Sequence, residues 1–558
     1  MNSFVPLLAA SLAAGAWLYN YHIQQRKKIL LGFAKLKYYQ GLPIVIIFDV
    51  GSSSIRASCF ALVSKAQWVF IDESLQQQHL SSIDDNGEAD IVKIEALVEK
   101  LMDQMMDFLR ATGLSQKVMG VGFSTFAMNV IGLDAKGNAV TPVYTYAGKR
   151  KATAKWSKVL RERLAECGEL EDTCNRTGTV IHQAYAPATF LRLLEEEPAV
   201  VERIAKWQTI SGYIIGKWTT PSQRRNFLPI SLSEASWMGL LDFRRCQWDA
   251  KLLELIGMEM TKMPLLADSS VPFMGLNAIY TRHWPELRNV PLFLGVSDGA
   301  AANIGSKRIA VTIGTSAAIR VVLSLDVMKT SKVPNGLWCY RFGKDHVLLG
   351  GALSDGGSMY KFFCERLRLS DEDIASQLDK LSPTKHGLTV LPFLSGERTP
   401  GWSESATCAI SGITKRTTPI EILRAGMESI ALRISLLFSL LVFLLYIWPT
   451  NSHRVAFSAD RDAAIVVSGT ALTSSRVWRQ MIADCLGKKV ILEAGAIEST
   501  SRGLAVLIGT YLNLHTLNES KMFPTEISCL ELSQPDATAH AAYLEARCHQ
   551  ESLYRKMY

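Results

Sequence analysis

Apolar positions repeat with two different periods along this chain, and the two periods alternate. Short apolar runs at 44–50 and 118–126 have the length and composition of buried strands. Residues 91–113 instead place apolar side chains at helical spacing and end at Gly113, a residue type common at helix C-termini. Strands that alternate with helices in this way predict an α/β architecture.

One pattern occurs twice: an apolar strand, a turn of glycine and hydroxyl residues, and a second strand. The first copy starts at residue 44 and the second near residue 309, about half the chain apart. An arginine follows each turn, Arg56 in the first copy and Arg320 in the second. The turn residues are Gly51, Ser52, Ser53 and Ser54 in the first copy and Gly314, Thr315 and Ser316 in the second. The repetition predicts a duplicated domain whose two hairpins face each other across a cleft.

Each turn has the chemistry of an anion site, because glycine lets backbone N–H groups approach a ligand closely. Asp49, at the end of the first strand, would repel a phosphate unless a cation lay between them. Mg²⁺ is the expected cation, since it accepts carboxylate, water and phosphate oxygens together. The alternative is a plain hairpin whose serines bond their own backbone. The chain contains neither GxxxxGK[ST] nor a GxGxxG motif that opens a helix after a strand.

Asp298 follows an apolar strand in GVSDGAAAN and lies between the two halves of the chain. A carboxylate at this place can accept the proton of a substrate hydroxyl while that oxygen attacks a γ-phosphate. The alternative is that Asp298 caps the alanine-rich helix that follows it.

Six segments resemble, in order, motifs of the FGGY carbohydrate kinases. They are DVGSSSIR, GVSDGAAANIGS, VTIGTSAAIRV, LPFLSGERTPGW, SGTALTSSRVWRQMIADCLGKKV and ESTSRGLAVL. The resemblance covers nearly everything after residue 44. Within the family, the chain most resembles the gluconate-kinase type. It implies two actin–hexokinase-like (ribonuclease H-like) domains that flank a nucleotide cleft, preceded here by an N-terminal apolar helix. It also implies ATP, Mg²⁺ and transfer of the γ-phosphoryl group to a sugar or sugar acid, with gluconate or a pentulose as the expected acceptor.

The resemblance assigns roles to particular residues. Asp298 would be the catalytic base, Asp49 would hold the metal, and the two hairpin turns would hold the phosphates. The adenine would lie at Gly469 and Thr470. The expected substrate contacts are Thr125, Met128, Tyr146, Arg150 and His182. For His182 the alternative is a loop histidine that is satisfied by its neighbours.

The chain departs from the family pattern at five positions. Ala127 and Met128 stand where gluconate-type relatives have Met-His, so one polar substrate contact is missing. Tyr146 replaces a tryptophan and Gly148 an aspartate, while Thr470 replaces the second glycine of the adenine turn. These changes leave the acceptor open. They also keep two alternatives open, an actin-like ATPase and a sugar-binding pseudokinase, either one tethered to a membrane.

We expect four regions. These are an N-terminal membrane-anchor or targeting helix at 1–28, a sugar-binding domain at 42–292, a nucleotide-binding domain at 293–515 and a C-terminal tail helix at 516–558. The formal net charge of +8 is mild for 558 residues, and no dense basic stripe indicates a nucleic-acid partner. The ten cysteines are scattered without a CxxC pair, which favours reduced thiols in a reducing compartment. The sequence makes no prediction about the oligomeric state.

Two uncharged stretches bear on membrane contact. Residues 1–25 contain no Asp, Glu, Lys or Arg, and Arg26, Lys27 and Lys28 follow at once. The positive-inside rule would leave the catalytic domains cytoplasmic, anchored through the N-terminus, with a cleaved or organelle-targeting segment as the alternative. The second stretch, 434–450, separates Asp298 from Gly469. Both residues must serve one cleft, so we expect a buried helix there instead of a membrane span.

Overall fold

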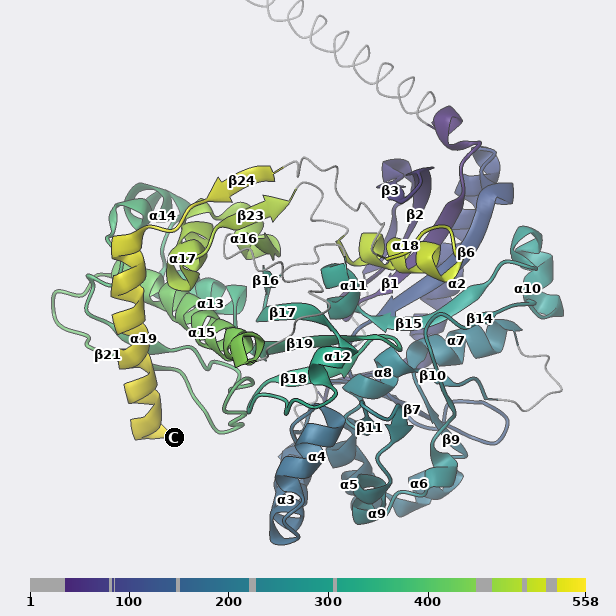
Figure 1. Cartoon of the computed structure of the whole chain (residues 1–558), viewed down its shortest axis with the longest axis horizontal. Coiled ribbons are helices and arrows are strands. Elements are labelled where there is room, and N and C mark those ends of the chain that lie inside the picture. The colour runs from purple at the N-terminus through teal and green to yellow at the C-terminus, as the bar shows by residue number, and fades with distance from the viewer. Residues whose placement is uncertain are drawn as a thin grey trace, which may run out of the picture.

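The computed structural model describes most of the chain. The described residues are 36–79, 83–84, 86–146, 151–219, 227–304, 309–447, 464–493, 499–517 and 529–558. The predicted N-terminal apolar helix at 1–28 lies outside them, as does Arg150. Within them the α/β expectation is confirmed, because the fold is built on two large mixed sheets, each covered by helices (Figure 1).

The first sheet has the strand order β14-β15-β6-β1-β2-β3, with β4 also paired to β2. Its strands are β1 (Ile44–Val50), β2 (Ser54–Ser64), β3 (Gln67–Phe70), β4 (Gln76–His79), β6 (Val118–Thr125), β14 (Pro272–Phe273) and β15 (Leu292–Ser297). β1 pairs antiparallel with β2 and parallel with β6. Every residue of β1 is buried, as its unbroken apolar run predicts for a central strand.

The helices α2 (Ile91–Ala111) and α18 (Ser499–Tyr511) pack on this sheet. α18 comes from the far end of the chain and lies on β1 and β6, beside α11 (Asp298–Ile304) (Figure 1). Glycine makes room for it: a Cβ at Gly122 in β6 would lie 2.0 Å from the side chain of Ile508. The first sheet therefore depends on a helix that follows every strand of the second sheet except β24 in sequence.

The second sheet has the order β18-β19-β17-β16-β22-β23-β24. Its strands are β16 (Ala310–Ile313), β17 (Ala317–Ser324), β18 (Trp338–Arg341), β19 (His346–Leu353), β22 (Ile465–Ser468), β23 (Val490–Glu493) and β24 (Cys529–Ser533). The helices around it are α13 (Gly357–Leu367), α14 (Asp371–Gln377), α15 (Pro419–Ile447), α16 (Thr470–Ser474), α17 (Arg476–Leu486) and α19 (Ala537–Met557).

Shorter elements complete the described fold. The remaining helices are α3 (Lys151–Glu166), α4 (Leu170–Thr177), α5 (Ala186–Glu196), α6 (Pro198–Arg203), α7 (Ile210–Thr219), α8 (Leu232–Trp237), α9 (Ala250–Ile256), α10 (Ala278–His283) and α12 (Leu325–Met328). Short 3₁₀ turns are η1 (Asp72–Ser74), η2 (Ser115–Lys117), η3 (Met260–Lys262), η4 (Pro285–Leu287) and η5 (Leu378–Lys380). Two-stranded pairs are β5 (Glu88–Ala89) with β8 (Val143–Tyr144), β7 (Ile131–Leu133) with β9 (Lys206–Gln208), β10 (Ile230–Ser231) with β13 (Leu266–Ala267), β11 (Leu241–Asp242) with β12 (Gln247–Trp248), and β20 (Thr389–Leu391) with β21 (Ala409–Ser411).

The apolar stretch from residue 434 is confirmed as part of a buried helix, as far as residue 443. It belongs to α15, whose segment Pro419–Phe443 is long and apolar enough to cross a membrane, yet 67% of its most apolar part is buried. α15 packs on β17 and β19 and on the helices α13, α14, α17 and α19. Moreover, β22, which follows α15, pairs with β16, which precedes it. One sheet therefore contains strands from both sides of the helix, and no span is compatible with that pairing.

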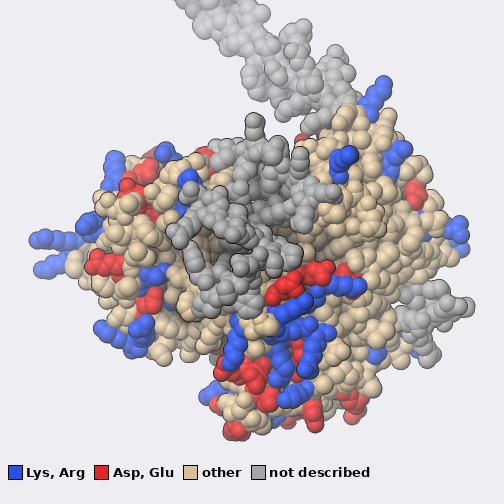
Figure 2. Space-filling view, in the orientation of Figure 1, with Lys and Arg blue, Asp and Glu red and all other residues tan. Residues whose placement is uncertain are grey.

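The two halves also meet through β18, the edge strand of the second sheet. The backbone N–H of Cys339 donates to the carbonyl of Gly178 at 2.8 Å, and the hydroxyls of Tyr185 and Tyr340 lie 2.6 Å apart. At the surface, Lys332 pairs with Glu171 across the same boundary at 2.8 Å. On the face shown in Figure 2, acidic and basic side chains lie intermixed and form no broad field of one sign.

The C-terminal segment does more than form a tail helix, because β24 adds an edge strand to the second sheet before α19 begins. α19 then donates a hydrogen bond to a buried ion pair. Arg433 of α15 bonds Glu397, and both side chains are 1% exposed. The hydroxyl of Tyr554 on α19 donates to the other oxygen of Glu397 at 2.6 Å, and its ring lies 5.0 Å from the Arg433 guanidinium.

We predict that Arg433→Met lowers the free energy of unfolding by about 3–5 kcal/mol, because it leaves the buried Glu397 carboxylate without its cation. Urea denaturation measures the change. Lys158→Met is the control, since Lys158 is 72% exposed and its pair with Glu162 is worth less than about 1 kcal/mol. If both variants lost the same free energy of unfolding, the Arg433–Glu397 pair would not be what holds α15 to the loop that contains Glu397.

Candidate active site

The first hairpin joins β1 to β2 at the centre of the first sheet. The N–H of Gly51 donates to the carbonyl of Ser54 at 3.0 Å and closes the turn. Asp49 lies opposite Arg56 in the strand register, and Arg56 donates to its Oδ2 at 2.5 Å. Burial raises the pKa of Asp49, and Arg56 opposes that rise. The predicted metal ligand thus already has a cationic partner.

The second hairpin joins β16 to β17 and packs against the start of α13. The N–H of Gly314 donates to the carbonyl of Ser316 at 2.9 Å, and the N–H groups of Gly356 and Gly357 donate to the carbonyls of Thr315 and Gly314. These bonds fix the backbone of the turn, while the side chains of Thr315 and Ser316 remain exposed.

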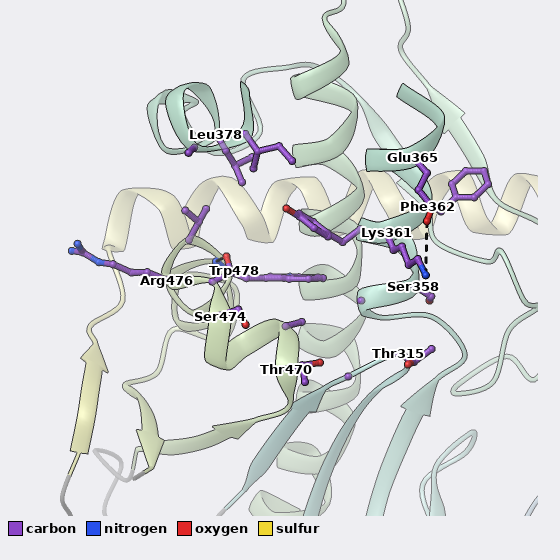
Figure 3. A pocket seen from close by; sticks show the side chains of 18 of the residues that line it. Thr315, Ser358, Lys361, Phe362, Glu365, Leu378, Thr470, Ser474, Arg476 and Trp478 are labelled. Carbon is purple, nitrogen blue, oxygen red and sulfur yellow. Dashed lines mark hydrogen bonds and ion pairs between the residues drawn. The ribbon is translucent and has the colours of Figure 1, made fainter. Parts of the chain in front are cut away.

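A cavity of about 790 Å³ opens beside the second hairpin. Gly314 and Thr315 form one end, and helices α13, α14, α16 and α17 form the walls. In Figure 3 the ring of Trp478 lies between Leu378 on one side and Thr470 on the other. The wall also has cationic groups: Lys361, which lies 3.8 Å from Glu365, and Arg476.

Of the two residues predicted at the adenine, Thr470 lines this cavity and Gly469 lies in the turn below it. Gly469 has φ +92°, and a Cβ there would lie 2.4 Å from the carbonyl oxygen of Ile313. Glycine is therefore required for the strand-to-helix turn to rest on β16. Sequence reasoning missed Trp478, although it lies within the segment that resembled an adenosine-binding motif.

A second cavity, of about 160 Å³, lies on the other side of the second hairpin. Of the predicted site residues, it brings together Met128, Tyr146, Asp298 and Ser316. Among the lining residues that the sequence reasoning did not assign to a site, five are aromatic or cationic: Trp338, Tyr340, Trp402, Arg320 and Arg398. Met128 and Trp402 have left-handed backbone conformations, with φ of 62° and 52°. Strain of this kind in non-glycine residues tends to gather at functional sites.

Asp298 is the first residue of α11 and faces this second cavity. Its Oδ1 accepts the N–H of the adjacent Gly299 at 2.6 Å, whereas the cap interaction of this helix comes from Ser297, whose hydroxyl accepts the N–H of Ala300 at 3.3 Å. The side chain is open to the cleft, but protein surrounds it closely enough for lost hydration to raise its pKa. Arg320 lowers that pKa and Asp49 raises it further. Asp49 of β1 and Asp298, which follows β15, lie near the carboxyl ends of parallel strands of the first sheet, so the charge of Asp49 acts on Asp298 along one edge of that sheet.

The strand that carries Asp298 is held by buried serines. Ser231 donates to the carbonyl of Gly295 at 2.6 Å, and Gly295 donates to Ser211 at 2.9 Å. Ser297 N–H donates to Ser233 at 3.1 Å. These bonds fix β15 immediately before the carboxylate.

The first hairpin reaches the same cavity through Ser52, whose hydroxyl accepts the Tyr146 O–H at 3.3 Å. Ser53 is exposed at the tip of the turn, and Ser54 begins β2, where it pairs with His79. The first hairpin therefore contacts the lining of this cavity through Tyr146, while Ser316 and Asp298 line the cavity themselves.

Two predicted substrate contacts do not reach the cavity. Thr125 is fully buried, and its hydroxyl donates to Oε1 of Glu234 at 3.1 Å, beneath the site. His182 is also buried and lies behind Trp402, with ring centres 5.1 Å apart. Burial, with the nearby charge of Arg398, lowers the pKa of His182 to about 3, so it is a neutral packing residue at physiological pH.

The described residues contain no group of three or more His, Cys, Asp or Glu side chains suited to hold a metal. Two carboxylates, Asp49 and Asp298, nevertheless fit Mg²⁺, which takes one or two protein carboxylates and draws its other ligands from water and phosphate.

Both sequence relatives and solved structures resemble this chain. The chain is 24% identical to gluconokinase from Bacillus licheniformis over 481 residues, covering 83% of this chain and 86% of that one. It is 23% identical to apulose kinase from Pectobacterium atrosepticum, covering 89% and 95%. Gluconate kinase and xylulose kinase from Lactobacillus acidophilus have the same fold, with TM-scores of 0.76 and 0.77 at 21% identity. Each of these structural matches covers 92% of this chain and 98% of the other.

Two family models match nearly the whole described fold. Residues 44–305 match the N-terminal domain of the FGGY family of carbohydrate kinases, and residues 309–511 match its C-terminal domain. Together with the cavity that the second hairpin and Asp298 line, these matches confirm the resemblance of the six motifs. The chain belongs to the FGGY family of carbohydrate kinases, phosphotransferases that use ATP and act on an alcohol group.

Proposed function

We propose that this kinase transfers the γ-phosphoryl group of ATP from the larger cavity to a hydroxyl of gluconate or a pentulose in the smaller one. One observation carries the proposal: the second hairpin separates the two cavities. Thr315 lines the larger cavity, and its neighbour Ser316 lines the smaller one together with Asp298. A triphosphate that follows the hairpin would end beside the carboxylate.

ATP fits the larger cavity for chemical reasons. Trp478 offers an aromatic face to a base, and Lys361 and Arg476 offer positive charge. The exposed hydroxyl of Thr315 at the end of this cavity can donate to a phosphate oxygen.

Asp298 is proposed as the base for the acceptor hydroxyl. Its raised pKa moves it towards the range in which a carboxylate accepts a proton effectively near neutral pH. Arg320 keeps it from becoming a neutral acid, because its positive charge favours the carboxylate. Aromatic walls such as Trp338 and Trp402 exclude water, which limits loss of the phosphoryl group by hydrolysis.

Asp49 and Asp298 are the proposed residues for Mg²⁺. Mg²⁺, when bound, neutralises phosphate charge and so favours attack by the acceptor oxygen. Arg56 holds Asp49 in place in the strand register and limits the repulsion between the two carboxylates.

We predict that Asp298→Asn lowers kcat, measured at neutral pH, by about 100- to 10,000-fold, because the amide cannot accept the hydroxyl proton. A coupled ADP-release assay with gluconate and xylulose measures it, and thermal unfolding checks the fold. Asp326→Asn on α12 is the control, since Asp326 is an exposed surface residue paired with Lys329. Unchanged turnover in Asp298→Asn would refute the role, and ATP consumption that ignores added sugars would favour an ATPase.

The buried His182 gives a pH prediction for stability. Its pKa is about 3 in the folded chain against an ordinary 6.5, so below pH 6.5 the unfolded chain gains a proton that the folded chain does not. Acidification from pH 6.5 towards 3 therefore destabilises the fold by about 1.4 kcal/mol per pH unit through this residue. Between pH 7.5 and pH 5, His182→Gln should lose about 2 kcal/mol less stability than the wild type.

Urea denaturation of both proteins at the two pH values measures this difference. The exposed His549 on α19 supplies the control, because its exchange for Gln removes no buried group. An equal acid loss in wild type and His182→Gln would contradict the neutral, buried state of His182.

We also propose that the N-terminal segment contacts a membrane and leaves the catalytic domains on the cytoplasmic side. The support is sequence alone: residues 1–25 lack charge and three cationic residues follow. Leu12→Arg should move the full chain from the membrane to the supernatant fraction after carbonate extraction, because it places a charge within the apolar run. Gln24→Arg adds the same charge beside that run and should stay with the membrane. Identical fractionation of both variants would overturn the anchor.

A further inference from the structure

Arg398 is a cationic residue in the lining of the smaller cavity. It follows β20 in the segment that also supplies Trp402, and its guanidinium lies 5.3 Å from the centre of the Tyr146 ring. Both side chains line the cavity that contains Asp298. The larger cavity has no contribution from Arg398.

The charge of Arg398 is not balanced by a neighbouring carboxylate. Among the residues that the structure describes, its guanidinium forms no ion pair and no hydrogen bond, whereas nearby acids have other partners. Glu397 pairs with Arg433, and Glu404 accepts the Ser157 hydroxyl at 2.9 Å and lies 3.7 Å from Arg161. After burial, the charge of Arg398 is the leading cause that lowers the pKa of His182. An uncompensated cation therefore borders the acceptor cavity.

The backbone around Arg398 is held from both sides. Glu397 is fixed by Arg433 and by the Tyr554 hydroxyl. On the other side, the Trp402 indole donates to the carbonyl of Gly336 at 2.8 Å, and the Trp402 N–H donates to the carbonyl of Arg398 itself at 2.6 Å. A binding group on a fixed backbone loses little conformational entropy when a ligand arrives.

We propose that Arg398 binds the carboxylate of the acceptor, so that the substrate of this kinase is a sugar acid and not a neutral sugar or polyol. This inference rests on the proposed function of the same site. A guanidinium presents paired N–H donors that match the two oxygens of a carboxylate. Asp298 repels a carboxylate, so the acid end turns towards Arg398 and a hydroxyl is left for the base. The cavity of about 160 Å³ suits a small metabolite, being below the range typical of drug-sized ligands.

The transferring phosphoryl group is the other anion that an arginine here could bind. The two sources differ in their consequences. A contact to the acceptor carboxylate acts on the KM of acids alone, whereas a contact to the phosphoryl group acts on kcat with every acceptor. The absence of Arg398 from the nucleotide cavity favours the acceptor.

The test measures steady-state kinetics of the full-length protein with gluconate, with its uncharged counterpart glucitol and with xylulose. The proteins are wild type, Arg398→Gln, Arg398→Lys and Lys155→Gln. Lys155 is the matched control, because it is a surface cation 4.7 Å above the ring of Trp156 and lies outside both cavities. We expect the wild type to prefer gluconate, and Arg398→Gln to raise the KM for gluconate by about 10- to 100-fold with little change in kcat.

Three further results support the inference when they accompany that one. The KM for glucitol and xylulose stays unchanged in Arg398→Gln, Lys155→Gln behaves as wild type, and Arg398→Lys falls between the wild type and Arg398→Gln because it retains the charge without the paired donors. The preference of the wild type needs no variant, so a misfolded Arg398→Gln does not remove the test.

Other outcomes overturn it. A wild type that phosphorylates xylulose but no sugar acid refutes carboxylate recognition and leaves the kinase function standing. An equal fall of kcat with all acceptors in Arg398→Gln assigns Arg398 to the phosphoryl group. A wild type that phosphorylates no acceptor at all refutes the proposed function itself, and with it this inference.

Discussion

The contact on which the active site depends is one between two backbones, where α18 lies against α11. A Cβ at Gly503 would lie 1.8 Å from the carbonyl oxygen of Ala301, so only glycine permits this approach. α11 begins with Asp298, and α18 also packs on β1 and β6 behind the first hairpin. Because α18 comes after the second sheet's central strands, the Asp298 carboxylate is positioned only when both ends of the chain have folded together.

The arrangement of carboxylates at this site is electrostatically unfavourable. Burial raises the pKa of both Asp49 and Asp298, and the charge of Asp49 raises the pKa of Asp298 further. Each half supplies an arginine on the second strand of its hairpin: Arg56 bonds Asp49, and the charge of Arg320 lowers the pKa of Asp298. Like charges held together in this way destabilise the empty site, and they are compensated best by the cation and phosphates of a bound nucleotide. The two hairpins share the arginine but not the acid, because Thr312 stands where the first hairpin has Asp49.

Sequence reasoning reached the parts of the site that local pattern specifies. Both hairpins, the Asp298 turn and the buried α15 follow from short runs with clear chemistry, and the structure brings the second hairpin and Asp298 to one cavity, whose lining the first hairpin contacts. It missed what long-range packing decides. Thr125 lies in the right strand, but its hydroxyl is taken by Glu234, more than a hundred residues later. Arg398 lies within a quoted segment, yet only the fold shows that Glu397 beside it is paired elsewhere and that Arg398 is left to face the cavity.

The acceptor cavity is assembled from three separate parts of the chain, and this explains how substrate choice can change while phosphotransfer is retained. The hairpin and Asp298 come from the sheets, whose strands are fixed by pairing and by buried serines. Arg398 and Trp402 come from a loop whose position depends on Tyr554 of α19, beyond the residues matched by the family model. An exchange at Met128 changes the lining of this cavity without altering a hydrogen bond of β15 or of the hairpins, whereas Tyr146 also donates to Ser52 of the first hairpin. Departures from the family pattern can therefore gather at the acceptor and leave the phosphoryl-transfer elements unchanged.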